Sequence, residues 1–210
     1  MNKLLVKDSK LDINNEMADI AIGTNNLTIN VFGSVCINDY HNDTDLALQI
    51  NLNPGAKLLY NRYNDNVKNF SLDLRLGSDS YAEFNYSLET TLESSLVLDA
   101  KITGSSSTSK INFHGVTSEN GVIKATATSE VIKDTKDNEV LENLRILALN
   151  DAENMIVPNL LVKTDSVNAI HNTTISSVSK DYLFYLNSKG INDNDAVQLI
   201  KNGFLKSNLK

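Results

Sequence analysis

The sequence predicts a mainly β protein that is closed by two short helices. From about residue 26 to residue 178, short stretches in which apolar and polar residues alternate follow one another, separated by polar clusters such as Asn53-Pro54-Gly55. Alternation with a period of two residues is typical of strands with one buried face. After residue 178 the apolar residues recur at helical spacing instead. The expected organisation is therefore an N-terminal arm (1–25), a β core (26–178) and a C-terminal helical domain (179–210).

The β core contains many strands of similar length. Segments of roughly 10 to 14 residues, each ending in a turn, fit a sandwich, a barrel or a β-solenoid, and no motif repeats at a fixed offset. Alternation alone does not choose among the three. The clearest strands are expected at 27–31, 46–52, 70–76, 84–86, 96–98, 111–113, 121–125, 144–147 and 160–162.

Asparagine occupies about one position in seven, well above its usual share. Asn tolerates left-handed backbone and caps its own turns, so we expect Asn to replace Gly in many turns. The polar residues 1–25 give no clear strand, and we expect a helical turn near residues 15–20 or a mobile arm there.

Two helices are expected at the C-terminal end of the chain. Ser179 can accept a hydrogen bond from a first-turn amide, and Gly190 can close the first helix in left-handed geometry. The second helix should begin at Asn192 or Asp193 and fray at Gly203.

Composition restricts the partners. The 210 residues carry 19 Lys and Arg against 26 Asp and Glu, a net charge of −7, without the basic cluster that nucleic acid requires. No apolar run reaches the ~18 residues that span a bilayer, and Met1–Lys10 does not fit a signal peptide. One cysteine, Cys36, suits a reducing compartment, and we expect a cytoplasmic protein with no membrane or nucleic-acid partner.

No enzyme signature is present. His41, His114 and His171 are scattered, and Cys36 with His41 is too small a set for a metal site. A β-helix carbohydrate enzyme would need paired carboxylates at a cleft, and no spacing points to such a pair. From the residues alone, His171 is either a turn residue or an imidazole ligand for iron or another borderline metal at a domain junction.

The stretch from His171 to Phe204 resembles the C-terminal signature of the SufB/SufD family of iron–sulfur cluster assembly proteins. The resemblance lies in His171–Thr174, in the Asp-Tyr-Leu-Phe-Tyr-Leu to Gly-Ile block at 181–191, and in the helix at 196–204. Upstream, residues 111–116 and the Leu-Ala-Leu-Asn-Asp block at 147–151, followed by Pro158, are similar to family strands in the same order.

This resemblance implies a right-handed parallel β-helix (β-solenoid) with a small C-terminal two-helix domain, acting as a scaffold and not as an enzyme. It also implies that the scaffold pairs through the β-helix with a SufB-like paralogue or a second copy, and that a SufC-like ABC ATPase docks on the helices. The docking candidates are Tyr182, Leu183, Phe184, Tyr185, Leu186, Gly190, Ile191, Val197, Ile200 and Phe204.

The sequence departs from the SufB branch in two places. Leu144 lies on the strand that carries a cysteine in that branch, and Asn172 replaces a glutamate. The resemblance therefore favours the SufD branch, in which the residue matching His171 is linked to nascent cluster formation at the subunit interface. No tightly bound cofactor is implied, only a transient iron–sulfur cluster or iron at that interface. The alternative is a β-solenoid interaction module with no iron–sulfur role.

Overall fold

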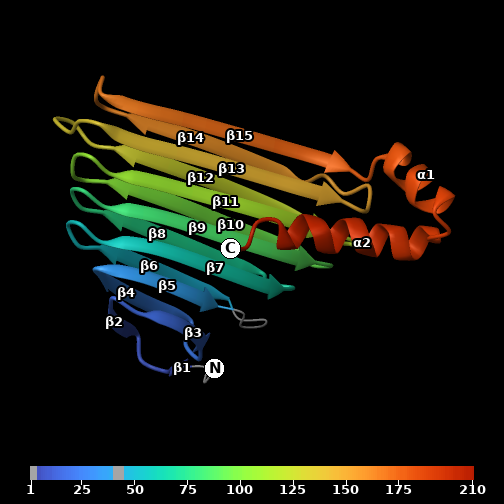
Figure 1. Ribbon diagram of the computed structural model, residues 1–210, viewed down its shortest axis with the longest axis horizontal. Helices are drawn as coiled ribbons and strands as arrows, with labels where there is room; N and C mark the ends of the chain where they lie inside the picture. Colours follow the sequence, from blue (N-terminus) through green and yellow to red (C-terminus); the bar gives the residue numbers. More distant parts are fainter. Residues whose placement is uncertain (1–3, 40–44) are drawn as a thin grey trace.

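The computed structural model describes residues 4–39 and 45–210, and this part of the chain winds as a β-solenoid (Figure 1). Successive strands alternate between two parallel sheets that share one core. The first sheet has the order β1 (Leu4–Val6), β3 (Met17–Ile22), β5 (Ser34–Asp39), β7 (Lys57–Asp65), β9 (Tyr81–Thr90), β11 (Thr108–Thr117), β13 (Asn138–Ala148) and β15 (Val167–Ser177). The second has the order β14 (Met155–Val162), β12 (Val122–Val131), β10 (Glu93–Ile102), β8 (Asn69–Leu76), β6 (Leu46–Leu52), β4 (Asn26–Phe32) and β2 (Lys10–Asn14). The solenoid, one of the three folds that alternation left open, is confirmed.

Inward-facing residues stack in register along the solenoid. Leu27, Leu48, Leu72 and Leu98 form one such column across β4, β6, β8 and β10, and all four are buried. Parallel strands lie about 4.8 Å apart, so each leucine packs directly on the next. This stacking explains why alternation recurs in strand after strand: every coil must present its apolar residues to the same core.

The N-terminal half of the solenoid encloses an ion pair. The Arg62 guanidinium and the Asp39 carboxylate contact each other, and both side chains are at most 1% exposed. Tyr60 Oη donates a hydrogen bond to Asp39 Oδ2 (3.0 Å), and the guanidinium lies 4.8 Å from the centre of the Phe70 ring. Burial and the neighbouring carboxylate of Asp39 raise the pKa of Tyr60 well above its ordinary value. The buried positive charge of Arg62 is therefore balanced by Asp39 of the same chain.

Residues 4–22 continue the solenoid and do not form a separate arm. β1 pairs with β3 and β2 pairs with β4, both in parallel register. The helical turn expected near residues 15–20 is not formed, because Met17–Ile22 is β3, with Ala18, Ile20 and Ile22 buried. The alternation of apolar and polar residues is short in this segment, so it does not predict a strand by itself. The strand forms because neighbouring coils cover its apolar side chains.

Asparagine occurs in turns, as expected, and also forms a ladder of side-chain hydrogen bonds on the surface of the first sheet. Asn15 and Asn66 do adopt left-handed backbone, as expected. However, four asparagines stand in register on the outer face of the first sheet: Asn38, Asn61, Asn85 and Asn112. The amides of the last three each donate to Oδ1 of the asparagine on the preceding coil, over 2.8–3.1 Å, and the Asn38 amide donates to Asp19 Oδ1 (3.0 Å). Such a ladder satisfies side chains along the stack as the backbone hydrogen bonds do.

The two expected helices are present as α1 (Lys180–Ser188) and α2 (Asp193–Lys206). Ser179 and Asn192 are their N-caps, and Gly190 follows α1 with φ = 85°, as the sequence predicts. The expected fraying at Gly203 is wrong, since α2 continues to Lys206. Leu205, beyond the glycine, is buried against β11 and β13 through Val116 and Leu147, which holds the last turn in place.

Candidate functional site

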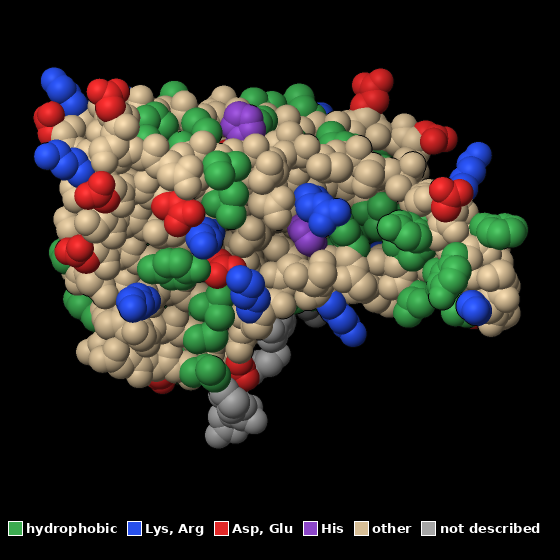
Figure 2. Space-filling view, turned by 45° about the horizontal axis from the view of Figure 1, so that its top comes forward, with side chains coloured by type: hydrophobic (Ala, Val, Ile, Leu, Met, Phe, Trp, Pro, Cys, Tyr) green, Lys and Arg blue, Asp and Glu red, His purple; other side chains and the backbone are tan. Residues whose placement is uncertain are grey.

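The last coil, formed by β14 and β15, leaves the solenoid open at its C-terminal end. Each strand is the terminal member of its sheet, so its outer backbone edge has no strand partner among the described residues. Ile156, Leu160, Val167 and Ala169 pack on the core from this coil without being fully covered. Figure 2, which brings this end forward, shows hydrophobic side chains along it. Unpaired edges beside apolar surface favour pairing with another chain. We call this surface the C-terminal edge; its exposed large hydrophobic side chains are Met155, Val157, Leu161, Val162, Ile170 and Ile175.

His171 lies in the middle of the C-terminal edge. It shares the inward face of β15 with Val167 and Ala169, but no further coil covers it and its side chain is exposed. Directly beneath it in register is Glu142 of β13. The histidine therefore lies exposed at the uncovered end of the solenoid.

Glu142 is a buried carboxyl group inside the solenoid. Its Oε1 accepts a hydrogen bond from Ser129 Oγ (2.6 Å), whereas Oε2 has no hydrogen-bond partner. Burial raises the pKa of Glu142, while the Ser129 hydrogen bond and the imidazole of His171 oppose this shift. No sequence pattern points to this residue, because a glutamate among alternating residues is expected to face solvent.

Other candidate ligands lie elsewhere. Cys36, on the outer face of β5, is five strands away from β15 in the same sheet, about 24 Å at the usual strand spacing. Burial raises the pKa of its thiol, which disfavours the thiolate. His41, its proposed neighbour, falls outside the described residues. Over residues 4–39 and 45–210, no group of three or more His, Cys, Asp or Glu side chains is placed to hold a metal ion.

His114 has a structural role. Its Nδ1 lies 2.8 Å from the backbone oxygen of Phe204, and the two rings stack with centroids 4.4 Å apart. The Arg145 guanidinium lies 5.3 Å from the centre of the same Phe204 ring. Burial lowers the pKa of His114. Phe204 was expected on a docking surface. Its ring instead packs between His114 and Arg145 and holds α2 against the first sheet.

The residues after α2 extend this attachment. Asn208 Nδ2 donates to the backbone oxygen of Tyr86 (2.8 Å), and Asn61 Nδ2 donates to that of Lys210 (2.7 Å). Lys201 in α2 pairs with Glu89 (2.6 Å). Helix α2 is thus fixed to β7, β9, β11 and β13.

Helix α1 is attached much more loosely. It has no buried residue, and Tyr182, Phe184 and Tyr185 are 67%, 77% and 59% exposed. Figure 2 shows these helices as a protrusion with hydrophobic side chains gathered on it. The other docking candidates differ: Leu183, Leu186, Ile191, Val197 and Ile200 are half-buried, and Gly190 is exposed.

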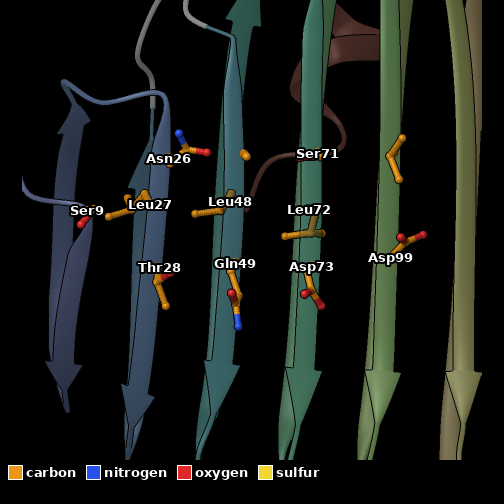
Figure 3. Close-up of a pocket in the computed structure, with 12 residues that line it drawn as sticks. Ser9, Asn26, Leu27, Thr28, Leu48, Gln49, Ser71, Leu72, Asp73 and Asp99 are labelled. Carbon is orange, nitrogen blue, oxygen red and sulfur yellow. The ribbon is translucent and has the colours of Figure 1, made fainter.

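A polar groove of about 430 Å³ crosses the outer face of the second sheet. Figure 3 shows Asp73 and Asp99 on neighbouring strands there, a pair that the sequence analysis did not find. Arg75 binds both oxygens of Asp73 (3.0 and 2.6 Å), and burial raises the pKa of Asp99. No aromatic side chain is among the described residues that line the groove. The groove lacks the aromatic platform and free carboxylate pair that would favour a carbohydrate enzyme.

Within the described residues, no helix is long and apolar enough to cross a membrane. The two parallel sheets, the two C-terminal helices on the first sheet and the uncovered last coil define the molecule as a β-solenoid protein. Residues 50–204 match the family model described as the SufBD core domain of SUF system FeS cluster assembly, and this match covers well over half of the chain. The chain therefore belongs to the SufBD core family of iron–sulfur cluster assembly proteins. A search of curated proteins finds no significant match.

Proposed function

We propose that this chain is a SufD-like scaffold subunit of a cytoplasmic iron–sulfur cluster assembly complex, and not an enzyme in its own right. The observation that carries the proposal is the position of His171 on the open C-terminal edge of a solenoid from the SufBD core family. The partners would be a SufC-like ABC ATPase and a SufB-like paralogue or a second copy, with neither nucleic acid nor membrane involved.

Pairing through the C-terminal edge is supported by its chemistry. A second solenoid end would cover the half-buried apolar residues of the last coil and pair the edge of β15, which is 11 residues long. Burial of apolar surface contributes about 25 cal/mol per Å² before the cost of association is subtracted. Such pairing would also enclose His171 between two subunits.

His171 would then act as a ligand for iron, which here is cargo and not a resident cofactor. A neutral imidazole suits ferrous iron. The strand that carries a cysteine in the SufB branch runs here through Leu144, which is fully buried in the core, and β13 has no cysteine to offer a thiolate. The sulfur chemistry would therefore come from the partner, and any cluster would be held transiently.

The ATPase would dock on α1. Exposed aromatic side chains on a short helix with no buried residue contribute little to folding, and aromatic residues are the usual anchors of protein interfaces. Phe204 and the half-buried residues of α2 would support this surface from below.

The test is cluster formation in the reconstituted complex. We expect His171→Ala to leave folding and subunit assembly intact and to abolish or sharply lower the yield of iron–sulfur cluster, measured by visible absorbance and by iron and sulfide content. Asn172→Ala is the matched control, since it removes the adjacent side chain on the opposite face of β15 and should leave the yield unchanged. A normal cluster yield from a fully assembled His171→Ala complex would instead favour an interaction module with no iron–sulfur role.

A further inference from the structure

Glu142 is a buried polar side chain near the C-terminal edge whose burial is only partly compensated. It is 0% exposed, and only one of its two carboxylate oxygens has a hydrogen-bond donor. Leaving a buried acceptor without a donor costs about 1–3 kcal/mol, and more for a charged group. An apolar residue would fit at this position, since Val140 and Leu144, the neighbouring inward-facing residues of β13, are both apolar and buried. The carboxylate therefore needs a reason beyond packing.

The register supplies that reason. Glu142 and His171 are direct neighbours on adjacent parallel strands and face inward together, so their backbones lie about 4.8 Å apart. Only the last coil separates Glu142 from the open end, and His171 belongs to that coil. One edge of the imidazole can face the carboxylate below while the other edge faces outward.

The carboxylate is also held in place from the opposite sheet. Ser129 lies on β12, is 2% exposed, and donates to Glu142 Oε1 across the interior of the solenoid. This hydrogen bond fixes one oxygen and leaves Oε2 available for a second donor. A neutral imidazole carries one N–H, which would satisfy that oxygen.

We infer that Glu142 is a positioning residue for His171: when the exposed imidazole turns toward the interior, one ring N–H donates to Oε2, which has no donor in the present structure, and the other, unprotonated nitrogen is presented at the C-terminal edge. The inference rests on the proposed function and deepens it. Metal-binding histidines usually donate their second ring N–H to a carboxylate or carbonyl, which fixes the tautomer and raises the basicity of the ligating nitrogen. Once iron binds, the positive charge above the carboxylate would also offset the cost of its burial.

The experiment compares Glu142→Gln with Glu139→Gln, a matched change on the outward face of the same strand. In the full metal-free chain, the ¹⁵N shifts of the His171 ring should report one tautomer for the wild type and for Glu139→Gln. Glu142→Gln should give a mixture of the two tautomers. In the assembled complex, anaerobic titration with Fe²⁺ should show a 10- to 100-fold weaker affinity for Glu142→Gln only, the usual cost of losing such a partner.

The outcomes separate the inference from the proposed function. If Glu142→Gln changes neither the tautomer nor the Fe²⁺ affinity while His171→Ala abolishes cluster formation, the positioning role is overturned and the scaffold function stands. If His171→Ala leaves cluster yield normal, the iron role fails, and an unchanged tautomer in Glu142→Gln would still overturn the positioning role by itself. Should Glu142→Gln fail to fold, Ser129→Ala replaces it, and a shift of the tautomer in the same direction supports the inference.

Discussion

The two ends of the solenoid differ in the length of their outermost strands and in the partner of the nearest buried charged side chain. At the N-terminal end the strands shorten to three residues in β1 and five in β2, and the charge buried nearby, Arg62, is paired with Asp39. At the C-terminal end β13 and β15 have 11 residues each, the outer edge of β15 is unpaired, and the buried Glu142 accepts a hydrogen bond from Ser129 instead of pairing with a cation. Short edge strands are a common protection against association. The two ends therefore differ in how much edge they expose and in whether the charge buried beneath it is paired.

The largest effect should come from the paired charge. Asp39→Ala leaves the Arg62 guanidinium buried without its counter-ion, and we expect a loss of about 3–5 kcal/mol in the free energy of unfolding. Glu142→Gln, which keeps the shape of the side chain and removes an unpaired charge, should cost no more than about 1 kcal/mol. Urea denaturation of both variants at pH 7.5 provides the comparison. Equal losses would mean that the two buried charges serve the same structural purpose.

The next effect concerns the edges. Ile170→Lys together with Ile175→Lys places two cations on the exposed surface of β15, and we expect association with the partner scaffold to weaken at least a hundredfold, about 2.7 kcal/mol. The matched control, Leu4→Lys with Leu5→Lys, changes equally exposed residues on β1 and should leave association unchanged. Sedimentation velocity measures both. Weakening by the β1 pair would place the contact at the N-terminal end instead.

Substitutions in α1 should weaken binding of the ATPase by a similar amount without lowering the stability of the fold. Phe184→Ala with Tyr185→Ala removes two exposed anchors, and such anchors commonly cost about 2 kcal/mol, roughly thirtyfold in affinity for the ATPase. The free energy of unfolding should change by less than about 0.5 kcal/mol because neither ring is buried. Calorimetric titration with a SufC-like ATPase tests this, and unchanged affinity would place the docking surface away from α1.

The smallest effect concerns His114. Burial lowers its pKa in the folded chain, so the unfolded chain binds a proton that the folded chain does not as the pH falls below about 6.5. Stability should therefore fall between pH 7.5 and pH 5.5, by about 1 kcal/mol from this residue. His114→Gln should lower stability at pH 7.5 and flatten the slope. A slope identical to that of the wild type would show that His114 does not control this pH dependence.

The sequence predicted the positions of strands and helices better than the way in which the strands stack into sheets. Alternation located strands such as Leu46–Leu52, and the caps at Ser179 and Asn192 located both helices. Alternation repeats in sandwiches and solenoids alike, so the parallel stacking followed only from the resemblance. The role of His114 and the pairing of Glu142 with His171 join residues 90 and 29 positions apart, and no local pattern carries such contacts. The position of His171 on the last coil was inferred correctly because the helices begin directly after it.

The attachment of residues 207–210 changes how the solenoid should unfold. A stack of coils in which each touches only its neighbours can melt from either end, coil by coil. Here hydrogen bonds reach from Asn208 and Lys210 back to Tyr86 and Asn61, so several central coils share one clasp and should open together. β15 lies outside the clasp, with contacts on one side only. The N-terminal coils and the coil that carries His171 are therefore the parts free to fray, and a partner bound to the last coil would hold that coil closed.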